Sequence, residues 1–312
     1  MYWWSYKGGF NLLKKLEDII NNLKISEKIK LVVAAAQDKE VLHAVLDATR
    51  MNIIEPILVG DINKIKEIAK QLKFSLENIE LINADSYEEA AEISVKLVSN
   101  NKADFIMKGI LDTSILLKSV LNKEYGLRTD SLLSHVMIYE LPEYHKLLIL
   151  TDGGMNISPN YEQKKQIVNN AIKACKALGA EEVKIAALAA KEKVDIKMQA
   201  TVDARALQED CEKGIFGENV ILEGPLAFDL VVSKEAAQIK GFNSKVSGEV
   251  DVILVPTIEV GNGIGKTLTY MAKAKSAGVV MGAKAPIVLV SRADSHESKL
   301  YSIAYGALIS KS

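Results

Sequence analysis

Short apolar runs alternate with helix-like segments along almost the whole chain, and this alternation limits the folds open to it. Residues 29–36 form a continuous apolar run, as expected of a strand that is covered on both faces. Residues 38–50 then place apolar side chains at helical spacing. Strand-like runs at 55–59, 79–82 and 104–107 are each followed by a helical segment. The alternation predicts βα units, a largely parallel sheet and the α/β class.

The rhythm changes near Arg128. Two runs, 134–139 and 147–150, lie close enough in the chain to be adjacent strands with a short link, and a new βα series follows. The length of 312 residues exceeds the roughly 100–150 residues of a typical domain. We therefore expect two domains, or one large α/β body, with a boundary near Arg128.

Charge and composition exclude several classes of function. The chain carries 39 basic and 40 acidic residues, a net charge of −1, which provides no general field for nucleic acid or an anionic membrane. No apolar run approaches the roughly 18 residues of a membrane span, and the aromatic N-terminus lacks the features of a secretory signal. Cys175 and Cys211 show no metal-ligand spacing and are expected to be free thiols. We expect a cytoplasmic protein with no metal site and no nucleic-acid or membrane partner.

A glycine-rich segment, Gly-Asn-Gly-Ile-Gly-Lys at residues 261–266, follows the apolar run 250–255 and precedes a helical pattern. It is not a P-loop, because the first glycine of G-x-x-x-x-G-K-[ST] would fall on Val260. It is not the dinucleotide pattern either, since the third glycine of G-x-G-x-x-G would fall on Lys266. Two interpretations remain: an anion-binding loop at a helix N-terminus, or a tight turn that needs glycine for its dihedral angles.

A second polar cluster, Ser291-Arg292, ends the apolar run 287–290. The planar guanidinium group of the arginine can bind two phosphate oxygens, and the neighbouring hydroxyl can donate to the same anion. The alternative is an exposed arginine beside a serine that starts a helix. Asp294 is either a helix N-cap with Glu297 as its capping-box partner or a general base. Ligands of open parallel sheets bind outside the carboxyl ends of strands, so both polar clusters are expected to face one cleft.

A series of short motifs runs through the chain in a fixed order. They are Met107-Lys108-Gly109, Gly126-Leu127-Arg128-Thr129, Leu150-Thr151-Asp152-Gly153-Gly154-Met155-Asn156, Gly224-Pro225-Leu226-Ala227-Phe228-Asp229, Val246-Ser247-Gly248, Val255-Pro256, Gly261-Asn262 with Lys266, Gly282-Ala283-Lys284-Ala285-Pro286, Ser291-Arg292-Ala293-Asp294-Ser295 and Lys299-Leu300-Tyr301-Ser302-Ile303-Ala304. In this order, and from about Ile29 onward, the chain resembles the phosphate acetyltransferase and phosphate butyryltransferase family, with the butyryl branch the nearer.

The resemblance implies two three-layer α/β/α domains with largely parallel sheets and a cleft between them. The first domain would hold residues 1–128 and about 280–312, and the second residues 129–279. The implied reaction is butyryl-CoA + phosphate = butyryl phosphate + CoA, in a homo-oligomer with coenzyme A as co-substrate and no permanently bound cofactor. Phosphate acetyltransferase is the alternative within the family. A nucleotide-phosphate enzyme and a catalytically silent ligand-binding homologue are the alternatives outside it.

The resemblance also implies catalytic roles. Ser291 and Arg292 would hold the phosphate and stabilise the charge that it gains as leaving group. The family's catalytic aspartate falls on Ser298 here, which cannot accept a proton near neutral pH. Asp294 or Glu297 would take its place, or the thiol would lose its proton in another way.

Substrate-binding positions follow from the same resemblance. A serine-rich loop of the acetyltransferases falls on Thr113 and Ser114, and an arginine that contacts the acyl phosphate falls on Lys118. The alternative is that Thr113 is a helix N-cap and that Lys118 is a solvated side chain. Further contacts with the substrate are expected from Asn262, Lys266 and Lys284, and Lys273 and Lys275 are additional cations for the phosphates of coenzyme A. The four histidines show no pairing in the sequence and are expected to be structural or exposed; they are His43, His135, His145 and His296.

Overall fold

The computed structural model describes residues 12–23, 29–291 and 294–312. The elements in chain order are α1 (Leu16–Leu23), β1 (Ile29–Ala34), α2 (Lys39–Arg50), β2 (Ile54–Gly60), α3 (Ile62–Gln71), β3 (Glu80–Asn83), α4 (Tyr87–Ser99), β4 (Phe105–Lys108), α5 (Thr113–Val120), β5 (Ser134–Glu140), β6 (Leu148–Thr151), α6 (Tyr161–Ala177), β7 (Val183–Leu188), α7 (Gln199–Glu212), β8 (Val220–Leu226), α8 (Phe228–Val232), α9 (Lys234–Ile239), β9 (Val252–Leu254), α10 (Ile258–Tyr270), β10 (Lys275–Met281), β11 (Ile287–Val288) and α11 (His296–Ser310).

The predicted alternation of strands and helices is confirmed at the start of the chain. Strand β1 is buried at every position except its second, which explains its continuous apolar sequence. Helix α2 begins where the Asp38 carboxylate accepts a hydrogen bond from the Val41 N–H. Helix α3 begins in the same way at Asp61, which accepts from the Lys64 N–H. Such caps satisfy N–H groups that have no partner in the first turn of a helix.

The strands form one mixed sheet in the order β3-β2-β1-β4-β11-β10-β5-β6-β9-β7-β8. Most neighbours are parallel, and the antiparallel pairs are β11 with β10, β10 with β5, and β5 with β6. The α/β class and the largely parallel arrangement are confirmed. The two halves of the fold, which correspond to the two expected domains, nevertheless share one sheet. Strands β10 and β5 join them by pairing from Lys275–Glu140 to Met281–Ser134.

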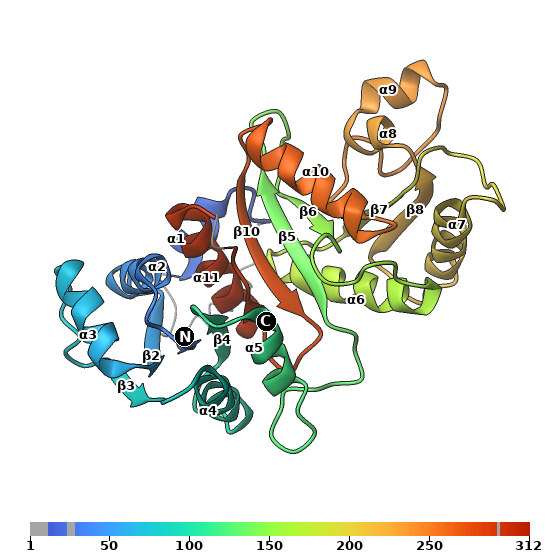
Figure 1. Ribbon diagram of the computed structural model, residues 1–312. Helices are drawn as coiled ribbons and strands as arrows, with labels where there is room; N and C mark the ends of the chain where they lie inside the picture. Colours follow the sequence, from blue (N-terminus) through green and yellow to red (C-terminus); the bar gives the residue numbers. More distant parts are fainter. Residues whose placement is uncertain (1–11, 24–28, 292–293) are drawn as a thin grey trace, which may run out of the picture.

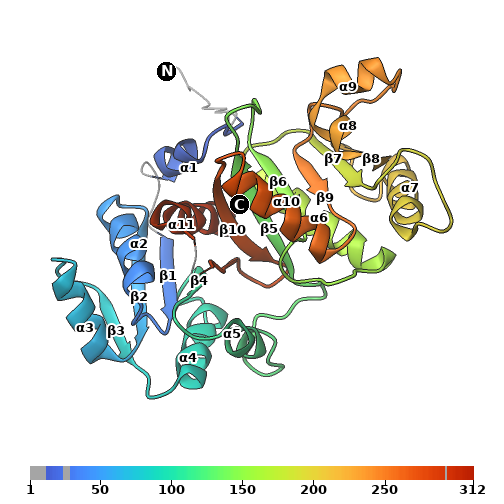
Figure 2. The ribbon, with the colours of Figure 1, turned by 45° about the horizontal axis from the view of Figure 1, so that its top comes forward.

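Helices cover both faces of this sheet (Figure 1). On one face, a single apolar core joins α1, α2, α6 and α11 and extends under both halves. On the opposite face there are two separate cores, one under α4 and α5 and the other under α8 and α10. Figure 2 shows α10 crossing in front of the central strands, well apart from α4 and α5. The central strands β5 and β10 therefore lie where the apolar cover of that second face is interrupted.

The chain ends inside the first half of the fold. Strand β11 is inserted between β4 and β10, and α11 packs against α1, α2 and β10. The assignment of this segment to a first domain stays a prediction, as does the boundary near Arg128. Among the described residues, no helix combines the length and apolar character needed to cross a membrane.

Candidate active site

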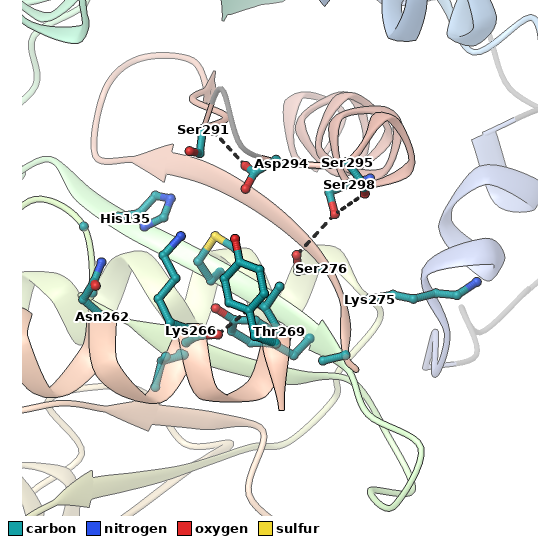
Figure 3. Close-up of a pocket in the computed structure, with 18 of the residues that line it drawn as sticks. His135, Asn262, Lys266, Thr269, Lys275, Ser276, Ser291, Asp294, Ser295 and Ser298 are labelled. Atoms are coloured by element: carbon teal, nitrogen blue, oxygen red, sulfur yellow. Dashed lines mark hydrogen bonds between the residues drawn. The ribbon is translucent and has the colours of Figure 1, made fainter. Parts of the chain in front are cut away.

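A cavity of about 680 Å³ lies over the central strands, between α10 and the connection from β11 to α11 (Figure 3). Its floor is the β5 and β10 surface and one wall is α10. The other wall is formed by Leu289, Ser291, Asp294, Ser295, Glu297 and Ser298. Ser291 of the second polar cluster thus lines the same cavity as Asn262 and Lys266 of the glycine-rich segment. The side chains discussed below that line it are His135, Met137, Tyr139, Leu150, Asn262, Lys266, Lys273, Lys275, Ser276, Leu289, Ser291, Asp294, Ser295, Glu297 and Ser298.

The floor is formed by alternate residues of β5. His135, Met137 and Tyr139 face the cavity, whereas Val136 and Ile138 belong to the core on the opposite face. Burial raises the pKa of the Tyr139 hydroxyl above its ordinary value, and the charge of Asp294 adds to this effect. Tyr139 is therefore a neutral hydroxyl under a polar cavity.

The loop after β6 is held in place by Asp152. Its Oδ1 accepts hydrogen bonds of 2.9 Å from the N–H groups of Gly154 and Met155. Its Oδ2 accepts from the Asn156 side chain at 2.6 Å and from the His135 N–H at 3.1 Å. Because Asp152 is almost fully buried, these bonds compensate for the loss of water around its charge. The loop is thereby fixed against the strand that carries His135.

The glycine-rich segment 261–266 is not a loop, and both interpretations of it as a loop or turn were wrong. It lies within α10, which begins after Thr257. Gly261 is buried where the helix meets the loop after β6, and an added Cβ there would lie 2.6 Å from the Gly153 Cα atom. The absence of side chains lets two backbones pack together, and this contact outweighs the low helix propensity of glycine. The helix presents Asn262 and Lys266 to the cavity (Figure 3).

Ser291 and Asp294 are joined by two hydrogen bonds. The Ser291 N–H donates to the Asp294 Oδ2 at 2.7 Å, and the Asp294 N–H donates to the Ser291 carbonyl at 3.1 Å. The interpretation of Asp294 as the helix cap was wrong, because Ser295 caps α11 by accepting from the Ser298 N–H. Glu297 is no capping-box partner either, since it accepts hydrogen bonds from Lys275 and Tyr301. The predicted phosphate ligand Arg292 lies outside the described residues.

Hydroxyl groups surround Ser298, on which the family's aspartate was expected to fall. Ser298 lies 3.1 Å from the Ser295 Oγ and 3.4 Å from the Ser276 Oγ, and all three serines line the cavity. These hydroxyls can donate to an anion but cannot take a proton near neutral pH. Lys266, Lys273 and Lys275 add cationic groups along the same cavity.

Four predicted substrate-binding residues lie elsewhere. Thr113, Ser114 and Lys118 are exposed on α5, and they do not line the cavity. The N-cap residue of α5 is Asp112, and Thr113 is the first residue of the helix, so Thr113 is not its cap. Lys284 is exposed in the turn between β10 and β11, where its N–H donates to the Leu127 carbonyl. The structure therefore brings Ser291, Asp294, Asn262 and Lys266 together without these four.

His135 is the functional candidate that sequence reasoning missed. Its ring lines the cavity, and its Nδ1 atom is buried without a hydrogen-bond partner among the described residues. An added Cβ on Gly154 would lie 2.6 Å from this atom, so glycine at 154 leaves room for the ring. Burial lowers the pKa of the imidazole, although the charges of Asp152 and Asp294 oppose this shift. The imidazole is therefore neutral at neutral pH and able to accept a proton.

The two cysteines take no part in this cavity, and both are free thiols. Cys175 is buried, and burial raises its pKa above the ordinary value, whereas Cys211 is half-buried. Neither has the environment of an activated nucleophile. The only described residues placed as a possible metal-ligand group, His43, Asp47 and His296, lie on α2 and α11 rather than in the cavity.

Comparisons with known proteins identify the family of this chain. The family described as "Phosphate acetyl/butaryl transferase" matches residues 15–96 and 85–307. A phosphate butyryltransferase of Clostridium acetobutylicum is 43% identical over 298 residues, which cover 96% of this chain and 99% of that protein. A phosphate acetyltransferase of Thermotoga maritima is 41% identical over 279 residues, covering 89% and 94%. The crystal structure of a branched-chain phosphotransacylase from Enterococcus faecalis V583 superposes with a TM-score of 0.80 at 32% identity, covering 90% of this chain and 99% of that one.

Proposed function

Since the chain belongs to the phosphate acetyl/butyryl transferase family, we propose that it transfers a short-chain acyl group between coenzyme A and phosphate. The reaction is acyl-CoA + phosphate = acyl phosphate + CoA, with butyryl as the favoured acyl group. The observation that carries this proposal is the single cavity that joins the Ser291–Asp294 turn to the lysines of α10 and its C-terminal connection. Coenzyme A is a substrate in this reaction, and the chemistry needs no permanently bound cofactor.

The residues that line the cavity would orient the two reactants. Lys266, Lys273 and Lys275 supply positive charge for the phosphates of coenzyme A. Ser291, together with the hydroxyls of Ser295 and Ser298 on the same wall and of Ser276 on the floor, can donate to the oxygen atoms of the acyl phosphate. The thiolate sulfur then attacks the acyl carbon, the carbon–oxygen bond breaks, and phosphate leaves with the electron pair. Holding the two groups together converts an encounter in solution into an oriented attack.

His135 is our choice for the group that removes the thiol proton. Ser298 cannot do this, and one oxygen of Asp294 is occupied by the Ser291 N–H. His135 is neutral, lies on the cavity floor, and faces the same space as Lys266 (Figure 3). The charge of Asp294 raises the basicity of this imidazole, which gives Asp294 a supporting role. Arg292, as in the family, remains the proposed ligand of the departing phosphate.

The acyl preference follows from the apolar part of the cavity. Met137, Leu150 and Leu289 line it close to the polar groups, so they offer a surface for two more methylene groups than acetyl has. Burial of one methylene is worth about 0.8 kcal/mol, so butyryl should be favoured over acetyl by roughly tenfold in kcat/KM. The names of the relatives support both acyl groups, and acetyl transfer is the alternative.

The decisive experiment measures thiol release from butyryl-CoA and acetyl-CoA in the presence of phosphate. We expect release that depends on phosphate and is faster for butyryl-CoA. Absence of release with every short-chain acyl-CoA would leave a catalytically silent homologue as the better description. Stabilisation by ATP but not by coenzyme A would point to a nucleotide-phosphate enzyme, which the helical conformation of residues 261–266 argues against.

We also propose a cytoplasmic homo-oligomer. Coenzyme A and acyl phosphates are intracellular metabolites, and free thiols persist in a reducing compartment. The homo-oligomer is suggested by the family resemblance, and sedimentation of the purified protein would test it.

A further inference from the structure

Two histidines and an aspartate meet where α2 contacts the start of α11. His43 and Asp47 are separated by one turn of α2, and His296 is the first residue of α11. The Asp47 Oδ2 lies 3.6 Å from the His43 Nε2 and 3.0 Å from the His296 Nε2. One ligand atom from each residue falls within 4.8 Å of the other two. We propose that His43, Asp47 and His296 bind a divalent transition-metal ion, with Zn²⁺ as the best fit.

The distances suit a tetrahedral ion. With ligands at about 2.0–2.1 Å from zinc, neighbouring ligand atoms in a tetrahedron are roughly 3.3 Å apart. The distances from the Asp47 Oδ2 to the Nε2 atoms of His43 and His296, 3.6 and 3.0 Å, lie on either side of this value. Residues four apart on a helix lie on the same face, so His43 and Asp47 reach the ion together without distortion of α2.

The surroundings favour an ion over a simple hydrogen-bonded cluster. The His296 Nε2 is buried, and despite the nearby carboxylate it has no hydrogen bond of acceptable geometry among the described residues. A metal ion between the three side chains would give this nitrogen a partner. Arg50 donates to the other oxygen of Asp47 at 3.0 Å, which holds Oδ2 toward the two imidazoles. Such outer partners commonly orient the ligands of a metal.

The donor set indicates the kind of metal. Two imidazoles and one carboxylate are typical ligands of Zn²⁺ and of other late first-row ions, whereas Ca²⁺ and Mg²⁺ prefer oxygen ligands alone. All three residues are half-buried, so water can occupy a fourth position. The site lies outside the cavity that contains Ser291, and it therefore has no direct part in acyl transfer.

The position of the site gives the ion a structural effect. His296 follows Ser295, the cap of α11, and lies two residues after Asp294. A bound ion would tie α2 to the beginning of α11, close to the turn that holds Ser291. Because an ion that binds only the folded chain stabilises it, metal should raise the melting temperature.

The test uses the full chain without an affinity tag, stripped of metal by a chelator and titrated with Co²⁺. We expect one equivalent of Co²⁺ to give visible absorption bands of a four-coordinate site, and Zn²⁺ to displace it and raise the melting temperature. His43→Gln and His296→Gln should each weaken binding by more than about 100-fold, because even the loss of an outer partner costs 10–100-fold.

His145→Gln is the matched control, since His145 pairs with Glu249 at 3.2 Å in another part of the surface. This variant should bind Co²⁺ like the wild type. The proposal is overturned if the wild type gives no four-coordinate spectrum, or if the folded His43→Gln and His296→Gln variants bind as tightly as the wild type. Circular dichroism of the metal-free variants establishes that they are folded. Acyl transfer by the metal-free protein is measured separately, so that failure of one proposal does not imply failure of the other.

Discussion

At the scale of single residues, His135 combines features that rarely occur together in an inert side chain. It lines a polar cavity, one ring nitrogen is buried without a partner in the described part of the chain, and burial lowers its pKa. Asp152 fixes its backbone and Gly154 leaves room for its ring. The neutral form is the one that can accept a proton, and the charges of Asp152 and Asp294 counteract the loss of basicity that burial causes.

Replacement of His135 by Gln should therefore reduce kcat/KM by about 10²–10⁴, the usual contribution of a general base. Gln keeps a polar side chain of similar length, so the melting temperature should change little. The measurement is the initial rate of thiol release, together with the binding of coenzyme A. A folded His135→Gln variant with nearly wild-type turnover would show that another group removes the proton.

Asp294→Asn provides the comparison for this variant. Asn retains an oxygen that can accept from the Ser291 N–H, so the turn should persist. It removes the charge that supports the basicity of His135, and we expect a loss of less than about tenfold. If Asp294→Asn lost a thousandfold and recovered at high pH, Asp294 rather than His135 would be the base.

The lowered pKa of His135 also predicts a dependence of stability on pH. Above its ordinary pKa of 6.5 the imidazole is neutral in the folded and unfolded chains, so its titration does not change the free energy of unfolding. As the pH falls below 6.5 the unfolded chain takes up a proton that the folded chain resists, so the free energy of unfolding decreases. Urea unfolding at pH 7.5 and 5.5 should show a larger decrease for the wild type than for His135→Gln. Equal decreases would mean that His135 titrates normally in the folded protein.

At the scale of elements, the position of α10 depends on a glycine that allows its backbone to pack closely against a neighbouring loop. Gly261 sits against Gly153 and Val255, whereas Gly263 in the same helix has open space around it. The first glycine allows α10 to approach the loop after β6, and so sets the position of Asn262 and Lys266. The second has no contact that an added methyl group would disturb.

This difference gives a matched pair of substitutions. Gly261→Ala would place a Cβ 2.6 Å from the Gly153 Cα atom and 2.8 Å from the Val255 Cγ2, so it should destabilise the protein by about 1–3 kcal/mol and raise the KM for coenzyme A. Gly263→Ala should stabilise the protein by up to about 1 kcal/mol through helix propensity. Urea unfolding and thiol-release kinetics measure both effects. Equal stability of the two variants would contradict close packing at Gly261.

At the scale of the whole molecule, the sheet and one of the cores are continuous between the two halves. Strands β10 and β5 pair over their full lengths, and one apolar core contains residues of β1, β6 and β7 together with α11. Breaking one half would expose the core of the other. The halves should therefore unfold together.

Differential scanning calorimetry should accordingly show a single transition, with the loss of tertiary fluorescence and of helical circular dichroism at the same temperature. Two separated transitions would indicate that the predicted boundary near Arg128 divides the chain into units of independent stability. Scan-rate controls are needed, because aggregation of the unfolded chain can merge transitions.

The sequence predicted what depends on local patterns. The strand at 29–36 and the helix after Asp61 were visible because burial on both faces and a capping side chain leave local signals. The position of residues 261–266 in a helix was not visible, since glycine alone favours a turn and the close packing of Gly261 against Gly153 is not recorded in the local sequence. His135 was missed because one histidine in an alternating strand carries no motif. The proximity of His43 and His296 depends on the packing of α2 against α11, which no spacing in the chain records.

The insertion of β11 between β4 and β10 has a consequence for synthesis of the protein on the ribosome. Strand β4 ends at Lys108, but its neighbour begins only at Ile287. At a synthesis rate of about 5–20 residues per second, the nascent chain would carry an unpaired strand edge for on the order of ten to forty seconds. Such edges pair readily with other chains. We therefore expect the recombinant yield to depend on chaperone supply and growth temperature, although the finished protein has no such exposed edge at β4.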